Sequence, residues 1–138
     1  MNSKSRSFSK GSKKRIIGWP EYISMVDELI HQIISSKIKF SCVFGPPRGG
    51  VIPAVIISHA LNKEFIDDYG FHLNHRRVLI VDDIVDTSET LNMYIKQCQV
   101  WKVRCWTASL FKHKNSPITP NFFVEETDCW VQFPYEKD

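Results

Sequence analysis

The chain has 138 residues, of which 43% are hydrophobic and 24% charged. These are ordinary values for a globular protein, so we expect one folded domain with a real core. No run approaches the roughly 18 consecutive apolar residues of a membrane span, and no apolar segment follows the basic start, so we expect neither a membrane contact nor a secretory signal. The four cysteines lack metal-site spacing, which favours a reduced, cytoplasmic setting.

The net charge of +3 comes from the N-terminal segment. Residues 1–15 contain six Lys or Arg and no acid, whereas the remainder has 12 bases and 15 acids. Because residues 1–15 are rich in Ser and Lys and poor in apolar side chains, we expect a disordered basic tail there and a folded domain over 16–138. The tail is either a solubilising segment or an arm for polyanions, and we expect contact with nucleic acid through this tail alone.

The first half of the domain shows a helix, a strand and a second helix. Trp19-Pro20 is typical of a helix start, and apolar residues recur at helical spacing over 22–34. A short buried strand is predicted over 40–45 and a helix over 51–61. The loop between them contains Arg48, Gly49 and Gly50. Glycines let the backbone approach an anion and Arg48 adds a charged fork, although an ordinary strand-to-helix turn explains this loop equally well.

Residues 62–77 connect to the next strand. Phe65-Ile66 is a candidate short strand. The basic residues that follow, His72, His75, Arg76 and Arg77, form either a short flap over a phosphate or a solvated turn.

An apolar run over 78–81 then ends in two adjacent acids, Asp82 and Asp83, followed by Asp86. Hydroxyl residues come next, immediately before a helical pattern over 90–98. In open α/β sheets ligands bind at the carboxyl ends of strands, and backbone N–H groups at a helix start favour phosphate. The pattern therefore indicates a sugar phosphate ligand, with a buried strand that ends in a solvated acidic turn as the alternative.

The last part of the chain adds strands at 103–111 and 122–124 and a closing segment at 128–136. Lys112-His113-Lys114 follows the first of these strands. The alternation of strands and helices predicts the α/β class, with a mainly parallel twisted sheet flanked by helices on both sides.

The stretch from Asp82 to Thr90 resembles the signature of the type I phosphoribosyltransferases, which is an apolar strand, two acids, two apolar residues, Asp-Thr-Gly and a later Thr. It departs at Ser88, where the family usually has glycine. The loop at 46–50 resembles the family's pyrophosphate-binding loop. The segment from Trp130 to Glu136 is similar to the C-terminal ends of bacterial xanthine–guanine and archaeal hypoxanthine phosphoribosyltransferases. The resemblance covers roughly residues 16–136.

This resemblance implies the type I phosphoribosyltransferase fold with a small C-terminal hood. It implies a Mg²⁺-dependent glycosyltransferase of the pentosyltransferase class, active in purine salvage, that joins hypoxanthine, guanine or xanthine to 5-phosphoribosyl 1-diphosphate. The products are a nucleoside monophosphate and diphosphate. The family also leads us to expect a homo-oligomer and a cis peptide bond between Pro47 and Arg48.

The resemblance also assigns roles to residues. Asp86 is the candidate general base for the purine N7 proton, and Asp82 and Asp83 serve the ribose hydroxyls and Mg²⁺. Lys114, or second Lys112, donates to the purine 6-oxo group, while Trp130 stacks on the base near the Val131 backbone. The remaining expected contacts are to the diphosphate (Arg48, Gly49) and to the 5-phosphate (Thr87, Ser88, Glu89, Thr90).

Two departures support a different class of function. Relative to the family, residues 62–77 are too short for a long lid over the site, and lids exclude water from a reaction. Ser88 is expected to replace the glycine only with a negative φ, at some loss of phosphate affinity. The alternative is therefore a catalytically weak protein of the same fold, which binds nucleotide or 5-phosphoribosyl 1-diphosphate as a regulator.

Overall fold

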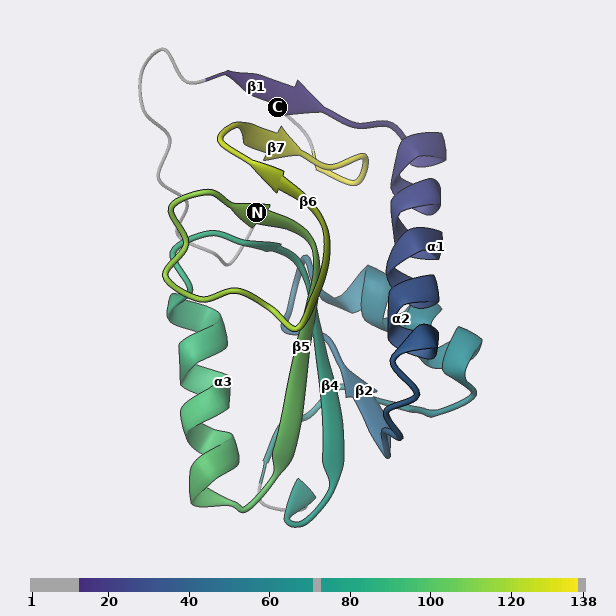
Figure 1. The fold of residues 1–138 in the computed structure, drawn as a ribbon, viewed down its shortest axis with the longest axis vertical. Helices are drawn as coiled ribbons and strands as arrows, with labels where there is room; N and C mark the ends of the chain where they lie inside the picture. The colour runs from purple at the N-terminus through teal and green to yellow at the C-terminus, as the bar shows by residue number, and fades with distance from the viewer. Residues whose placement is uncertain (1–12, 71–72, 137–138) are drawn as a thin grey trace.

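A computed structural model describes residues 13–70 and 73–136 (Figure 1). Most of the expected tail, and His72 of the expected flap, lie outside the described residues. The boundary of the folded domain differs from the prediction, because Lys14–Ile16 forms strand β1. Within the described residues no helix combines the length and apolar character needed to cross a membrane.

The centre of the fold is a five-stranded parallel sheet with the order β3-β2-β4-β5-β6. This confirms the predicted parallel sheet. Strand β4 continues through both acids, further than the apolar run alone predicted, and its residues after Arg77 are buried. The strands span Cys42–Phe44 (β2), Glu64–Ile66 (β3), Arg77–Val85 (β4), Arg104–His113 (β5) and Phe122–Thr127 (β6).

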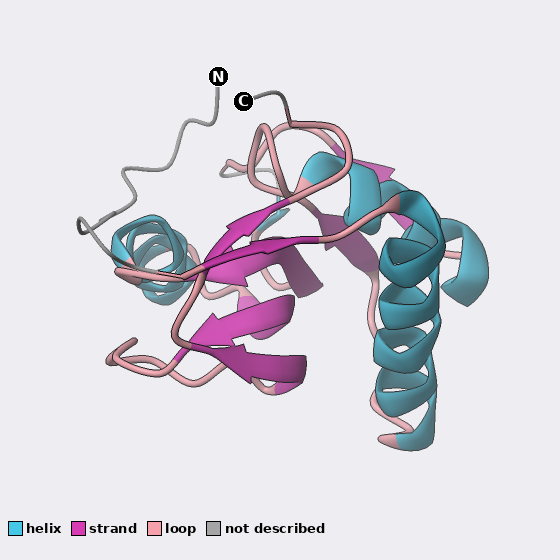
Figure 2. Ribbon diagram, turned by 90° about the horizontal axis from the view of Figure 1, so that it is seen from above, coloured by secondary structure: helices cyan, strands magenta, loops and turns pink. Residues whose placement is uncertain are grey.

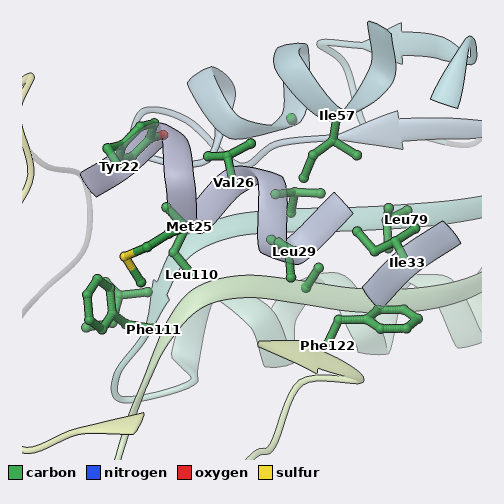
Figure 3. Packing of buried hydrophobic residues seen from close by; sticks show 14 of the residues in the cluster. Tyr22, Met25, Val26, Leu29, Ile33, Ile57, Leu79, Leu110, Phe111 and Phe122 are labelled. Atoms are coloured by element: carbon green, nitrogen blue, oxygen red, sulfur yellow. The ribbon is translucent and has the colours of Figure 1, made fainter. Parts of the chain in front are cut away.

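Helices cover both faces of this sheet (Figure 2). Helices α1 (Trp19–Ser35) and α2 (Val51–Leu61) lie on one face, and α3 (Glu89–Val100) lies on the other. The apolar stripe of α1 packs against β5 and β6, and the close view shows this stripe beside Leu110 and Phe122 (Figure 3). The sheet is therefore buried on both sides, which explains why its central strands are continuous apolar runs.

A second, two-stranded sheet joins the two ends of the described chain. Strand β1 pairs in parallel with β7 (Trp130–Gln132), and Figure 1 shows this pair above β6, at the far end from the base of α3. Arg15 of β1 forms ion pairs with Glu21 of α1 and Glu125 of β6. The expected C-terminal hood thus includes a strand from the N-terminal side.

The described residues 67–70 and 73–76 do not form a flap over the acids. Residues 67–70 follow the carboxyl end of β3, where the Tyr69 ring lies 5.0 Å from the Tyr94 ring of α3, and residues 73–76 precede the amino end of β4. The backbone N–H of His75 donates to Lys102 O at 3.2 Å, at the amino ends of the strands. Arg76 and Arg77 lie at that same edge, five or more residues before Asp82 along β4, so the flap prediction is wrong for the described residues.

Candidate functional site

The carboxyl end of β4 places the two acids inside the molecule. Asp82 is 4% exposed and Asp83 is fully buried. Backbone N–H groups donate to both carboxylates at 2.8 Å, from Asp83 to Asp82 Oδ1 and from Ile84 to Asp83 Oδ1. Buried carboxylates need such donors, so the strand end holds two oriented acids rather than a solvated acidic turn.

A hollow opens immediately after the acids, where the chain enters α3. Asp86 is half-buried at its wall, and the backbone of the loop turns into the first turn of the helix, whose N–H groups have no partner within the helix. A helix start of this kind favours an anion. The hollow is lined by Asp82, Ile84, Val85, Asp86, Thr87, Ser88, Glu89, Thr90 and Leu91.

Ser88 takes the glycine conformation, contrary to the expectation of a negative φ. Its φ is 70° and it is the residue that precedes α3. The buried Ser88 hydroxyl forms a hydrogen bond of 2.7 Å with Ser116, whose hydroxyl also donates to Ile118 O. A serine therefore keeps the loop shape in the left-handed region and attaches it to the loop that follows β5.

The glycine-rich loop between β2 and α2 lies directly against the acids. The peptide bond between Pro47 and Arg48 is cis, as expected, and the Arg48 side chain is exposed. A Cβ added to Gly49 would lie 2.1 Å from Asp83 Oδ2, so glycine is needed at this close approach. The two loops that the sequence indicated separately thus form one site.

Tyr135 completes this contact, and the sequence reasoning did not select it. Its hydroxyl oxygen lies 2.9 Å from Asp83 Oδ2 and 3.4 Å from Gly49 O. Burial raises the pKa of Tyr135, so the phenol is protonated at neutral pH and donates. Tyr135 lies within the segment from Trp130 to Glu136 that resembles the relatives' C-terminal ends, but nothing in the sequence indicated its partner.

Aromatic packing fixes the position of Tyr135. Its ring stacks on Phe133 with 5.6 Å between centroids and lies edge-on to Tyr22 at 5.7 Å. The exposed ring of Trp19 lies 6.2 Å away. The start of α1 and the end of the chain thus jointly support a side chain that contacts the acidic pair.

The two candidate lysines differ in their surroundings. Lys112 pairs with Val85 in the strand register, its side chain is 8% exposed, and Nζ lies 3.5 Å from Glu126 Oε2. Lys114 is exposed and follows the end of β5, although its backbone N–H donates to Thr127 O. The pairing with Val85, which lines the hollow, places Lys112 closer to the site.

The two C-terminal candidates lie on β7. Trp130 is half-buried, and its backbone N–H donates to Lys13 O at 2.9 Å. Val131 is 1% exposed and belongs to the core. Strand β7 is therefore anchored by its buried residue Val131 and by pairing with β1.

No family model matches the chain. It is 25% identical over 138 aligned positions to the xanthine-guanine phosphoribosyltransferase of Chromohalobacter salexigens, an alignment that covers 87% of this chain and 82% of the relative. The fold is similar to that of a purine phosphoribosyltransferase from Pyrococcus horikoshii, with a TM-score of 0.80, 26% identity, and coverage of 91% of this chain and 95% of that one.

A second solved structure, the xanthine-guanine-hypoxanthine phosphoribosyltransferase of Helicobacter pylori, has a TM-score of 0.75 at 19% identity. The superposition covers 87% of this chain and 91% of the other chain. At this identity the likeness is evidence for the fold alone. The signature loop at the end of β4, the parallel sheet order and these relatives agree. The chain is therefore similar in sequence and in fold to the type I phosphoribosyltransferases.

Proposed function

We propose that this protein is a purine phosphoribosyltransferase that joins a 6-oxopurine to 5-phosphoribosyl 1-diphosphate and releases diphosphate. The observation that carries the proposal is the contact between two loops, in which the buried Asp83 carboxylate packs on Gly49. A substrate with a phosphate at each end of a ribose requires an anion loop on either side of paired carboxylates. The hollow before α3 and the glycine loop before α2 provide that arrangement.

The substrate would be held at both ends. The helix start and the hydroxyls that line the hollow would bind the 5-phosphate, where Thr87 is exposed and Thr90 half-buried. The exposed Arg48 guanidinium and the Gly49 backbone would hold the diphosphate, on which negative charge develops as its bond to ribose C1 breaks.

The two buried acids fit a Mg²⁺ ion. Within the described residues no cluster of three or more His, Cys, Asp or Glu could enclose a metal by itself. Mg²⁺ usually binds through one or two carboxylates together with substrate phosphates and water, so Asp82 and Asp83 would hold it beside the bound diphosphate. The ion would supply charge stabilisation for the leaving group.

On the base side, a new bond forms between the purine nitrogen and ribose C1 as the old one breaks. Asp86, half-buried beside the hollow, would accept the proton that the purine loses. Lys112 would donate to the 6-oxo group, and the partly exposed Trp130 ring would stack on the base above Val131.

The test is diphosphate release with Mg²⁺ and 5-phosphoribosyl 1-diphosphate, with hypoxanthine, guanine, xanthine and adenine supplied separately. We expect release with at least one 6-oxopurine and its loss, by about 100-fold or more, in Asp86→Asn. Asp27→Asn, an exposed acid on α1, is the matched control and should keep full activity. Release with adenine alone would refute the 6-oxopurine assignment.

One observation favours a second function, a regulator that binds nucleotide or 5-phosphoribosyl 1-diphosphate without efficient chemistry. The described part of residues 67–76 packs under α3 and at the amino ends of the strands, so it does not cover the acids. Calorimetry separates the two functions. Binding of 5-phosphoribosyl 1-diphosphate without turnover of any of the four bases would establish the regulator.

A further inference from the structure

The edge of the sheet opposite the candidate site carries a concentration of positive charge. We call it the basic face. It lies where the strands begin and the helices end, at the lower end of Figure 1, whereas the β1–β7 pair lies at the top. Its members come from four separate loops or strand starts: Lys37, Lys39, Lys63, Arg76, Arg77, Lys102 and Arg104.

Backbone contacts join these segments into one surface. The Arg77 guanidinium donates through Nε to Lys39 O at 2.6 Å. The His75 N–H donates to Lys102 O at 3.2 Å, and Arg77 and Arg104 are paired in the register of β4 and β5. The cations therefore lie side by side even though they are up to 67 positions apart in the sequence.

The charge at this edge is not the average charge of the chain. After residue 15 the sequence has 12 bases and 15 acids, yet the basic face collects seven of those bases. The acid within these segments is Glu64, which forms an ion pair with Arg76 at 3.1 Å. The acids of the candidate site lie at the opposite edge of the sheet, at the carboxyl end of β4.

Two of the lysines occupy backbone positions that suit glycine. Lys37 follows α1 with φ 61°, and Lys102 follows α3 with φ 53°. A left-handed residue after a helix is usually glycine, because a Cβ is strained there. The favourable free energy between an exposed cation and a helix C-terminus is smaller than the cost of that backbone strain. Helix stability therefore does not account for a lysine at both positions.

Arginine and aromatic side chains are combined at the same face. The guanidinium carbons of Arg77 and Arg104 lie 4.7 and 5.6 Å from the ring centroid of the half-buried Trp106. Stacking on a fixed ring orients each guanidinium, and an oriented guanidinium suits the paired oxygens of a phosphate. Proteins that bind single strands combine a basic track with such planar groups.

We propose that the basic face binds the phosphodiester backbone of single-stranded nucleic acid without reading its sequence. The cations, spread over four loops, match a repeating anion better than a single phosphate. The bound strand would leave the carboxyl edge open, so this inference is independent of the enzymatic proposal.

The test compares two variants of the full chain that each lose four positive charges. The face variant is Lys37→Asn, Lys39→Gln, Lys63→Gln and Lys102→Asn, where asparagine suits the left-handed positions. The tail variant is Lys4→Gln, Arg6→Gln, Lys10→Gln and Lys13→Gln, with the same change in net charge. Binding is measured by fluorescence anisotropy with labelled 20-nucleotide single-stranded RNA and DNA between about 50 and 200 mM salt.

We expect the face variant to bind at least tenfold more weakly at the lowest salt concentration. Each lost phosphate contact lowers the salt slope of log affinity by about 0.7, so the slope should fall by about 3 in the face variant. The tail variant should retain most of the affinity. Equal thermal unfolding midpoints for the variants and the unmodified chain would show that the difference is not a folding defect.

Four outcomes would overturn the proposal. They are no binding of either strand by the unmodified chain, an unchanged face variant, a loss in the tail variant as large as in the face variant, and binding to phosphatidylserine vesicles in place of nucleic acid. Should the face variant unfold, Lys39→Gln with Lys63→Gln removes two of the exposed charges at positions without the left-handed conformation, and a slope decrease of about 1.4 is then expected.

Discussion

The hydroxyl of Tyr135 donates a hydrogen bond to the buried carboxylate of Asp83, and the two oxygens lie 2.9 Å apart. This contact joins the end of the chain to the acidic pair at its centre. Tyr135 contacts both the buried carboxylate and the carbonyl of the glycine loop, so it fixes the position of each relative to the other. We therefore infer that Tyr135 is a positioning residue for the proposed reaction.

Tyr135→Phe keeps the aromatic packing and removes the hydroxyl. Because a hydrogen bond to a charged group contributes about 1.5–3 kcal/mol, we expect kcat/KM for 5-phosphoribosyl 1-diphosphate to fall by roughly tenfold or more. The matched control is Tyr69→Phe, which removes a phenolic hydroxyl in the separate aromatic cluster beside α3 and should change it less than twofold. An unaltered KM and kcat in Tyr135→Phe would show that Asp83 is positioned without it.

Gly49→Ala tests the contact between the two loops. The added Cβ would lie 2.1 Å from the Asp83 carboxylate, so the carboxylate or the loop must move. We expect a loss of about 1–3 kcal/mol in unfolding free energy together with loss of diphosphate release. Gly18→Ala is the control, because the nearest atom to its added Cβ is 3.7 Å away, and urea unfolding should scarcely change.

Ser88→Gly and Ser88→Ala separate backbone strain from the hydroxyl contact. Both variants lose the hydrogen bond to Ser116, but alanine keeps a Cβ at a φ of 70°. We expect the glycine variant to be the more stable of the two by about 1 kcal/mol in urea unfolding. Equal stabilities would mean that the left-handed conformation at this position carries no measurable strain.

The two lysines near the proposed base site are distinguished by Lys112→Met and Lys114→Met. Methionine preserves the apolar stem of the buried Lys112 and removes its ammonium group. We expect the KM for the purine to rise at least tenfold in Lys112→Met and to stay within about twofold in Lys114→Met. The reverse result would assign the base contact to the exposed lysine.

Stability should depend on pH through a pair of thiols between α3 and β5, Cys98 and Cys105. A hydrogen bond from Cys105 lowers the pKa of Cys98 to about 7, and the contact with Tyr69 acts in the same direction. The pKa in the folded chain is lower than the ordinary thiol pKa of 9.0, so the stabilisation is present above pH 9 and is lost as the pH falls through 7. Urea unfolding should therefore show higher stability at pH 8.5 than at pH 6.5, and Cys105→Ala should reduce that difference.

Much of the fold and part of the site could be predicted because they depend on local patterns. The buried run before Asp82 requires a strand covered on both faces, and the helical spacing after Tyr22 requires a helix with one apolar side. The acids at the end of that strand and the glycine loop were found in the same way, whereas the cis peptide bond at Arg48 was expected only from the family resemblance. The sequence by itself therefore determined the sheet, the helices and the two loops of the candidate site.

The tertiary structure decided which distant residues meet. Tyr135 reaches Asp83 across 52 positions, and the seven cations of the basic face come together because all parallel strands begin at one edge. For the described residues, the same geometry decided between the flap and the solvated turn that the sequence had left open, since a chain that enters a parallel strand must first return to that edge. Neither periodicity nor motif spacing records such contacts, because they follow from the order of the strands and from packing between segments that are far apart in the sequence.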